Sequence, residues 1–408
     1  MNDMNAGVPT MKWEFGYWGG TLNNWYSQGL PKNNFVELPA TITNPAESVH
    51  TYVWTCENKY VREGEYPPTM PVTGGAVYYQ TGGFPDEKDV TRHFNMDSHA
   101  RAVTVNLQFE PFFEPKTIFE DEERIRYTDI DGVERIYIKN AGYPGSEKWP
   151  ITDRKSWEQI KEERLNFNNI SERFPKNWKQ LVKEYNEGDN PIVVGGYPHG
   201  YFGFLATYVG YENLFFMYYD DPGLVHEIHD HITNLWLTIY EEVFKDVKID
   251  ALHIWEDVSM GTGPMISPAL IKEFMIPYYK RLTAFFRDKG VKCIFVDTDG
   301  NCKSIIPTLM EGGMTAMYPF EWHTGMYIEE VRKEFPNLRM TGGIPKGEIH
   351  KGKKRIDEIL EPVQEVLNTG GYIPHCDHFV SPDVDFENFS YYRERLNEMI
   401  DSTAKKKE

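Results

Sequence analysis

Ionisable side chains directly follow five short apolar segments in the second half of the chain. Such groups act as proton donors, proton acceptors or metal ligands, depending on their neighbours. Five successive segments ending this way are hard to attribute to chance. We therefore take these positions as the candidate site. The residues that follow the five segments are Glu256 and Asp257; Asp297 and Asp299; Glu321 and His323; Lys346; and His375, Cys376, Asp377 and His378.

Three roles are assigned to these residues and to the polar and aromatic residues beside them. The predicted catalytic residues are Glu256, Glu321, His323, Lys346, His375 and His378. The predicted substrate-binding residues are Trp255, Asn301, Trp322 and Tyr372. The predicted metal ligands are Asp297, Asp299 and Cys376, which offer oxygen and sulfur donors of kinds that zinc accepts. No spacing among them is a recognised zinc signature, so the presence of a metal stays open.

Each residue also has a purely structural interpretation. An Asp or Asn after a strand often caps the next helix, which applies to Asp299 and Asn301. Glu256 and Asp257 are explained equally well by pairing with an arginine. We expect Asp297 to point inward and Asp299 to cap or brace the loop.

We expect Glu256, Asp297, Glu321 and His375 to open into one cavity. Crowded acids and histidines shift each other's pKa values. An imidazole between carboxylates is expected to have a raised pKa, so that it donates a proton near neutral pH. Cys376 is expected to be dispensable.

The elements that position these residues alternate between helix and strand from about Asp153 onward. Apolar segments such as Ala251–Trp255 and Val291–Val296 are separated by amphipathic helices such as Asp221–Val243 and Pro268–Lys289. This alternation predicts a parallel sheet. At least six such units favour a TIM (β/α)8 barrel, with the catalytic groups at the carboxyl ends of its strands.

The first part of the chain follows a different pattern. Lys12–Pro31 resembles a cap of loops and short helices. Val103–Leu107 alternates, and Ile125–Ile138 brackets an Asp-Gly turn, which is a strong hairpin signal. These features predict an N-terminal cap and a small antiparallel β insertion over residues 1–150, packed on a barrel over residues 151–408.

Composition excludes several classes of function. The net charge of −19 argues against nucleic-acid and anionic-membrane partners, which require basic patches. The four cysteines form no CxxC pair and no disulfide framework. No apolar segment approaches the length needed to span a bilayer, and no signal peptide is evident, so a cytoplasmic enzyme is expected. The aromatic content of 14% fits either core packing or an aromatic pocket wall.

A family resemblance rests on a series of motifs in a fixed order, which covers the chain from about Trp157 to its end. They are His253-Ile-Trp-Glu-Asp-Val, Ile266-Ser-Pro, Pro277-Tyr-Tyr-Lys-Arg, Val296-Asp-Thr-Asp-Gly-Asn, Tyr318-Pro-Phe-Glu, Thr341-Gly-Gly-Ile-Pro-Lys, Gly370-Gly-Tyr-Ile-Pro-His-Cys-Asp-His and Ser381-Pro-Asp-Val-Asp-Phe-Glu-Asn-Phe. With these motifs the chain resembles the uroporphyrinogen decarboxylase superfamily.

Within this superfamily the chain looks like the corrinoid-dependent methyltransferases. True decarboxylases carry an N-terminal arginine motif for the substrate's carboxylates, whereas Met11–Pro31 contains no arginine. Relatives that activate thiols bind zinc through a His-x-Cys pair and a later cysteine. Here Asp297-Thr298-Asp299 replaces that pair, and only Cys376 remains. Many relatives also have Gly-Gly-Ile-Asp-Lys, where this chain has Pro345 in place of the aspartate.

The resemblance implies transfer of a methyl group from a small substrate to a corrinoid protein, with O-demethylation of a methoxylated aromatic as one form. The cobalt would come from that partner, since no cobalamin-binding histidine motif is present. Zinc is a possible second cofactor, and the oligomeric state is open. Two alternatives remain: a decarboxylase or other lyase acting on a small carboxylic acid, and a non-catalytic ligand-binding barrel.

Overall fold

A sheet of seven parallel strands forms the centre of the protein. The computed structural model describes residues 10–33, 65–66, 68, 70–73, 87–97, 100–138 and 144–405. The sheet order is β15-β14-β13-β12-β9-β8-β3, and every neighbouring pair is parallel. The strands are β3 (Arg101–Ala102), β8 (Ile192–Gly196), β9 (Ala251–Trp255), β12 (Cys293–Asp297), β13 (Ala316–Tyr318), β14 (Arg339–Thr341) and β15 (Tyr372–Ile373).

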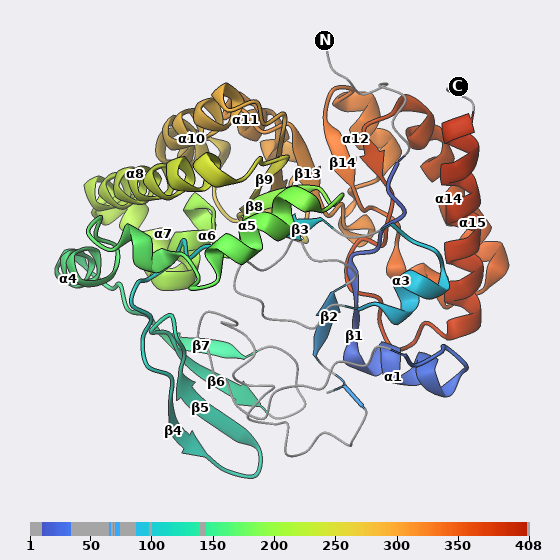
Figure 1. Ribbon diagram of the computed structural model, residues 1–408, viewed down its shortest axis with the longest axis horizontal. Helices are drawn as coiled ribbons and strands as arrows, with labels where there is room; N and C mark the ends of the chain where they lie inside the picture. Colours follow the sequence, from blue (N-terminus) through green and yellow to red (C-terminus); the bar gives the residue numbers. More distant parts are fainter. Residues whose placement is uncertain are drawn as a thin grey trace.

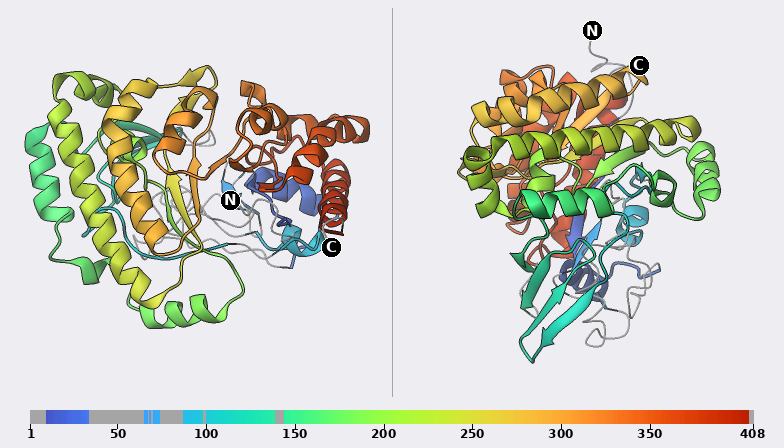
Figure 2. Two further views of the ribbon diagram at one scale, coloured as in Figure 1. Left: turned by 90° about the horizontal axis from the view of Figure 1, so that it is seen from above. Right: turned by 90° about the vertical axis from the view of Figure 1, so that its left-hand side faces the viewer.

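Helices cover the outer face of this sheet (Figures 1 and 2). In Figure 1, α8, α10 and α11 form one flank, and α12, α14 and α15 form the other. The helices are α1 (Gly19–Ser27), α3 (Asp89–His93), α4 (Arg154–Arg164), α5 (Trp178–Glu187), α6 (Tyr201–Tyr208), α7 (Tyr211–Asp220), α8 (Pro222–Asp246), α9 (Pro268–Leu270), α10 (Ile276–Asp288), α11 (Ile306–Glu311), α12 (Ile328–Glu334), α13 (Lys346–Ile349), α14 (Lys353–Thr369) and α15 (Phe386–Lys405).

The arrangement confirms the predicted TIM-like α/β fold. The sheet curls, and a parallel bridge between Tyr17 and Val380 brings strand β1 (Gly16–Trp18) beside the segment that follows β15. In the described part of the chain the parallel ladder has seven strands, so it forms a curled half-barrel and not a complete eight-stranded ring. Strand β1 also pairs with β2 (Pro71–Thr73) in an antiparallel ladder.

The predicted β insertion is present as a four-stranded antiparallel sheet, which projects from the lower part of Figure 1. Its hairpin joins β5 and β6 across the predicted Asp131-Gly132 turn. Arg135 of β6 lies between two fully buried carboxyls, with Nε 3.1 Å from Oδ2 of Asp129 and Nη2 paired with Asp131. The strands are β4 (Lys116–Glu120), β5 (Arg124–Thr128), β6 (Glu134–Ile138) and β7 (Gly145–Lys148).

The prediction that Val103–Leu107 belongs to the insertion is wrong. The nearest strand, β3, is an edge of the main sheet and pairs with β8, and Val103–Leu107 lies outside any strand. The apolar side chains of Val103, Val105 and Leu107 are buried without forming a strand. Some backbone groups of this segment bond to side chains: the Arg173 guanidinium donates to the Asn106 carbonyl and the Trp236 indole donates to the Leu107 carbonyl. The boundary near residue 150 stays a prediction, and Cys56 lies outside the described residues.

Two helices that the sequence pattern does not indicate, α6 and α7, lie between β8 and α8. Helix α6 is almost entirely buried, so it shows no polar face and no amphipathic period. Helix α7 follows it directly. The predicted helix Pro268–Lys289 is divided by a π-helical turn over Ile271–Met275. The turn ends just before Pro277, which has no N–H to continue the α-helical pattern.

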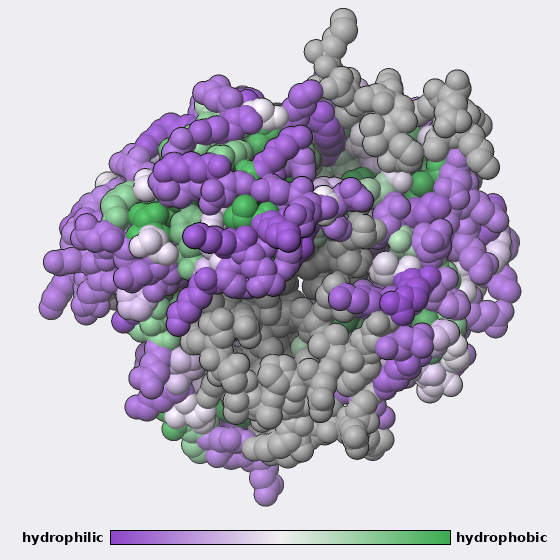
Figure 3. Space-filling model, viewed as in Figure 1, coloured by the Kyte–Doolittle hydropathy of each residue, from purple (hydrophilic) through white to green (hydrophobic). Residues whose placement is uncertain are grey.

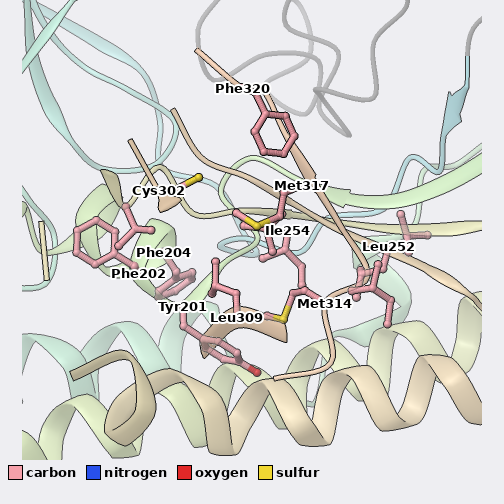
Figure 4. Packing of buried hydrophobic residues seen from close by; sticks show 14 of the residues in the cluster. Tyr201, Phe202, Phe204, Leu252, Ile254, Cys302, Leu309, Met314, Met317 and Phe320 are labelled. Atoms are coloured by element: carbon pink, nitrogen blue, oxygen red, sulfur yellow. The ribbon is translucent and has the colours of Figure 1, made fainter. Parts of the chain in front are cut away.

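Strand β9 shows which side chains face the helices. Figure 4 shows Leu252 and Ile254 packed among apolar residues that include Leu309 and Met314. Successive side chains of a strand point to opposite faces. His253 and Trp255 therefore lie on the other face, which lines the interior of the curled sheet.

The surface over the described helices is mainly hydrophilic in the view of Figure 3. Among the described residues, no helix combines the length and the apolar character that a membrane crossing requires.

Candidate functional site

Four carboxyl groups gather at the carboxyl ends of β9, β12 and β13. Asp257 is the common neighbour, because its pKa is raised first by burial and then by Asp299, Asp297 and Glu321 in turn. The pKa of Asp257 reaches about 8. The clustering of acids at adjacent strand ends agrees with the position expected for the site of a parallel barrel.

Asp257 is held in a strained backbone conformation. Its φ is +45°, in the left-handed region that few non-glycine residues adopt. Strain of this kind costs about 1–3 kcal/mol and is concentrated at functional sites. The backbone N–H of Asp299 stabilises the ionised Asp257 carboxyl, although less than burial destabilises it.

Glu256 faces away from this cluster, so the prediction that it shares the cavity is wrong. It is fully buried and accepts hydrogen bonds from the backbone N–H groups of Tyr201 (2.8 Å) and Gly203 (2.9 Å) at the start of α6. Burial raises the pKa of Glu256 to about 8. These hydrogen bonds to Glu256 hold the first turn of α6, which explains the position of Glu256.

Asp297 points inward, as predicted, at the end of β12. Its side chain is 6% exposed, and its Oδ2 lies 3.4 Å from Nε2 of His253. The same histidine nitrogen lies 2.9 Å from the hydroxyl of Tyr318 on β13. Burial, and then the charge of Asp299, raise the pKa of Asp297 well above its usual value. These groups form the floor of the site inside the curled sheet.

The side chains of Asp299 and His378 are partly exposed to solvent. They are 40% and 23% exposed, and Oδ2 of Asp299 lies 3.8 Å from Nε2 of His378. Glu321 lies beside them and accepts a hydrogen bond from the backbone N–H of Gly300 (2.7 Å). We name the group formed by Asp257, Asp299, Glu321 and His378 the acidic recess, because it lies at the carboxyl ends of the strands and is only partly exposed.

The prediction that Asp299 braces the loop is wrong, because Asn301 does so. Asn301 accepts from the backbone N–H of Lys303 (3.2 Å) and donates to the carbonyl of Thr324 (2.8 Å). Both ends of its side chain are therefore used within the protein. Its predicted role in substrate binding gains no support from this geometry.

Lys346 is a cation of the site among the residues that the structure describes. Its Nζ lies 3.6 Å from Oδ1 of Asp377, and its charge lowers the pKa values of Asp299 and Glu321 against the larger effect of burial. The pKa of Asp299 is about 6. Asp377 is fully buried and accepts from the backbone N–H groups of Lys346 and Trp322. It thereby joins the loops that follow β13 and β14.

The expected raised imidazole pKa values are contradicted. Burial lowers the pKa of His375 to about 3 and that of His378 to about 4, where Lys346 adds to the effect. His375 is fully buried, with Nδ1 2.7 Å from the Cys376 carbonyl oxygen and its ring 4.5 Å from that of Trp13. Both imidazoles are neutral near pH 7. The protonated groups in the recess are carboxyls instead.

The three residues predicted for zinc do not form one site, because Cys376 lies apart from Asp297 and Asp299. The thiol of Cys376 is fully buried beside Tyr392 and Glu14, and burial raises its pKa well above the usual value. Zinc binds the thiolate and not the thiol. Within the described ranges, no group of three or more His, Cys, Asp or Glu side chains is arranged to hold a metal ion. The donor set does not fit zinc.

Substitution of Cys376 by serine is therefore expected to leave turnover within about twofold of the unmodified protein. The thiol lies outside the recess, so only a small loss of stability is expected, about 1 kcal/mol for a buried change of this size. The measurements are the rate of substrate conversion and the thermal midpoint. A loss of bound zinc together with all activity would show a thiolate site that this geometry lacks.

Aromatic side chains border the acidic recess. Tyr211 begins α7, and its pKa is raised by burial and then by Asp257 and Asp299. The ring of Phe15 lies 4.8 Å from that of His378. Trp255, which precedes the acidic residues of its loop, packs 4.6 Å from Tyr197. These rings supply the apolar surface expected of a pocket for a small organic molecule.

The chain is similar to known proteins in its sequence profile and in its fold. The profile of the uroporphyrinogen decarboxylase (URO-D) family matches residues 136–399, well over half of the chain. The chain belongs to this family. A methyltransferase from Methanosarcina mazei is similar in structure, with 15% sequence identity, a TM-score of 0.49, and coverage of 67% of this chain and 76% of the other. That likeness is too low to carry any argument about activity. No curated protein matches the sequence at a significant level.

Three other residues predicted in this member of the uroporphyrinogen decarboxylase family lie outside the recess. The ring of Trp322 stands over the Arg355 guanidinium and lines a separate surface pocket between α12 and α14. Tyr372 is buried and donates to the Gly342 carbonyl (2.7 Å). His323 is exposed beside Gly347.

Asp257 was among the candidate positions but was given no role from the sequence, although a signal for its direction was present. In β9, the side chains of His253 and Trp255 point to the interior of the curled sheet. If the same alternation is continued past the end of the strand, Asp257 is expected to point to the interior and Glu256 to the helices. The importance of Asp377 and Tyr318 has no comparable signal, because their contacts come from loops far apart in the chain.

Proposed function

We propose that this member of the uroporphyrinogen decarboxylase family transfers a methyl group from a small methoxylated aromatic compound to a separate corrinoid protein. The observation that carries the proposal is a carboxylic acid, Asp257, that keeps its proton near neutral pH beside a solvent-accessible recess bordered by aromatic rings. An ether oxygen is a poor leaving group unless it is protonated as the carbon–oxygen bond breaks. A positioned acid typically contributes about 10²–10⁴-fold to such a rate.

The residues of the chain have defined tasks in this proposal. The aromatic rings, including Tyr211 and Trp255, hold the substrate ring with its methoxy group toward Asp257. As the bond between the methyl carbon and the oxygen breaks, its electron pair stays on the oxygen, which takes the proton of the Asp257 carboxyl. Burial, and then the charges of Asp299, Asp297 and Glu321, maintain the high pKa of Asp257, so that the proton is present when it is needed.

The partner protein supplies the remaining chemistry. A reduced corrinoid bound to it provides the cobalt nucleophile that accepts the methyl group. The described cysteines Cys293, Cys302 and Cys376 are free thiols, which supports a location in the reducing cytoplasm as part of the same proposal.

Two alternatives are less well supported. Several carboxyl groups in the recess disfavour the anionic substrate of a decarboxylase, because like charges repel. A non-catalytic barrel would be favoured by strand-end groups closed to solvent, whereas the side chain of Asp299 is 40% exposed.

The proposal is tested by mixing the purified chain with guaiacol and chemically reduced cobalamin, which stands in for the partner's cofactor. We expect an enzyme-dependent change in the cobalt absorption spectrum and formation of catechol in equal amount. Omission of either guaiacol or the protein is the control. Release of carbon dioxide from a small aromatic acid, without cobalamin and without any spectral change, would contradict methyl transfer and support the decarboxylase alternative.

A further inference from the structure

Helix α7 carries large aromatic side chains on the face that it turns to solvent. Its inner side is formed by Leu214, Met217 and Tyr218, which are buried where the helix contacts α6 and α8 (Figure 1). On the outer side, Phe216 is 62% exposed and Tyr219 is 74% exposed. An amphipathic surface helix normally has charged and polar residues on this side, so α7 departs from the usual pattern.

The exposed aromatic residues of α7 form a continuous row. Side chains three or four positions apart are neighbours on a helix surface, so Tyr219 lies beside both Phe215 and Phe216. At the start of the helix, Tyr211 is 41% exposed, and its ring lies 6.3 Å from that of Phe215. Contiguous exposed apolar residues mark interaction sites, whereas single ones are ordinary. We name Tyr211, Phe215, Phe216 and Tyr219 the α7 aromatic face.

The α7 aromatic face begins beside the candidate site. After burial, the charge of Asp257 is the next cause of the raised pKa of Tyr211, and Asp299 also contributes. The Tyr211 hydroxyl therefore lies near both acids. Tyr219 follows eight positions later, so the face extends about 12 Å along the helix from the acidic recess. A partner that covers this face would lie next to the candidate site.

The charges on α7 decide which kind of partner fits. Glu212 and Asp220 are exposed, and among the described residues no lysine or arginine nitrogen lies within 4.0 Å of their carboxylate oxygens. The neighbouring Asp221, in contrast, pairs with Arg154. In a symmetric contact between two copies, the same surface meets itself, so these acids would repel each other. An anionic membrane would be repelled as well. A protein surface with lysine or arginine around its apolar residues complements this face in charge.

We infer that the α7 aromatic face is a docking surface for a partner protein whose apolar side chains are framed by lysine or arginine. In the proposed function this partner is the protein that carries the corrinoid, because its cobalt must reach the site that the face adjoins. This identity rests on the proposed function. The surface and its charge rest on Phe216, Tyr219 and the two unpaired acids.

The test uses two synthetic amphipathic helices as probes. One is built from leucine and lysine, and the other has the same sequence with glutamate at every lysine position. Binding of each labelled peptide to the full chain is measured by fluorescence anisotropy near pH 7 at low salt. We expect the leucine–lysine peptide to bind about tenfold or more tightly than the leucine–glutamate peptide, and the difference to shrink at high salt.

Variants place this binding on α7. Phe216→Ser combined with Tyr219→Ser removes the two most exposed rings, and we expect it to weaken binding of the leucine–lysine peptide about tenfold or more. Both side chains are exposed, so the double variant should fold normally and should demethylate guaiacol with free reduced cobalamin at an unchanged rate. Phe167→Ser is the matched control, because Phe167 is 42% exposed but lies outside α7. It should leave binding unchanged.

Equal binding of the two peptides, or peptide binding that survives in the double variant, would overturn the inference. Sedimentation of the full chain tests the other occupant: self-association that disappears in the double variant would show that a second copy covers this face. The peptide measurements contain no nucleophile, so they are independent of the methyl-transfer assay. A protein that demethylates guaiacol but fails the peptide test would keep the proposed function and lose only this inference.

Discussion

Replacement of Asp257 by asparagine is expected to lower kcat/KM for methyl transfer by about 10²–10⁴-fold, the usual contribution of a positioned general acid. Asparagine has nearly the same shape and tolerates the left-handed conformation that Asp257 adopts at φ +45°. The variant should therefore fold normally, with a thermal midpoint close to that of the unmodified protein. Substrate affinity measured without a nucleophile should change far less than turnover.

The pH dependence gives a second test of the same residue. The acid must hold its proton, so kcat/KM is highest below its pKa and falls as the pH rises through that value. Burial, and then neighbouring acids, raise the pKa of Asp257 to about 8, above the value of about 6 for Asp299. Because the acids titrate together, the fall in kcat/KM at alkaline pH belongs to the group, in which Asp257 keeps its proton to a higher pH than Asp299.

We expect the unmodified protein to lose activity above about pH 8, by about tenfold for each further pH unit. Asp257→Asn should not show this loss of activity at alkaline pH. A variant whose kcat/KM is unchanged, or whose kcat/KM still falls above about pH 8, would show that another group donates the proton.

Replacement of Arg135 by methionine is expected to lower the free energy of unfolding by about 3–5 kcal/mol, the usual cost of removing one partner from a buried ion pair. The Arg135 side chain is 7% exposed, and both Asp129 and Asp131 are fully buried. Loss of the guanidinium leaves two neighbouring carboxyls in a low-dielectric environment. Burial and the proximity of Asp131 already raise the pKa of Asp129 to about 8, against the opposing effect of Arg135.

A matched control lies on the same antiparallel sheet. Arg126 pairs with Glu134 at 2.6 Å and with Glu147 at 2.7 Å, but its side chain is 37% exposed. Arg126→Met should change stability by only about 0–1 kcal/mol, because exposed pairs contribute little. Denaturant unfolding of the two variants provides the comparison. Equal effects in both would show that burial does not set the strength of the Arg135 interactions.

The Arg135 variant should also affect the site. The guanidinium acts on Tyr197, whose ring packs against Trp255 at the border of the recess. We expect loss of the Arg135 ion pairs to displace the insertion and, through Tyr197 and Trp255, to weaken substrate binding. The variant should therefore raise KM more than it lowers kcat. The insertion is thus expected to support one wall of the pocket.

The sequence alone was sufficient to predict the fold class and the edge of the sheet where the site lies. Apolar segments alternating with amphipathic helices leave few alternatives to a parallel sheet, and polar residues at strand ends share one edge because all strands run in the same direction. The hairpin was equally clear from its Asp-Gly turn. Helix α6 escaped prediction because its burial on nearly all sides removes the period on which such predictions depend.

Only the tertiary structure decided which members of each polar group do chemistry. Glu256 and Asp257 are adjacent in sequence, yet one holds the start of α6 and the other faces the recess, because both follow the end of β9 and Asp257 adopts a left-handed backbone conformation. Burial lowers the pKa of His375 to about 3, because desolvation outweighs the hydrogen bond with the Cys376 carbonyl that favours the charged imidazole. Cys376 faces Tyr392 and Glu14, outside the recess, although it lies one residue from Asp377. Residue types restrict the possible chemistry, whereas the direction of each side chain and its access to water depend on packing between segments far apart in the chain.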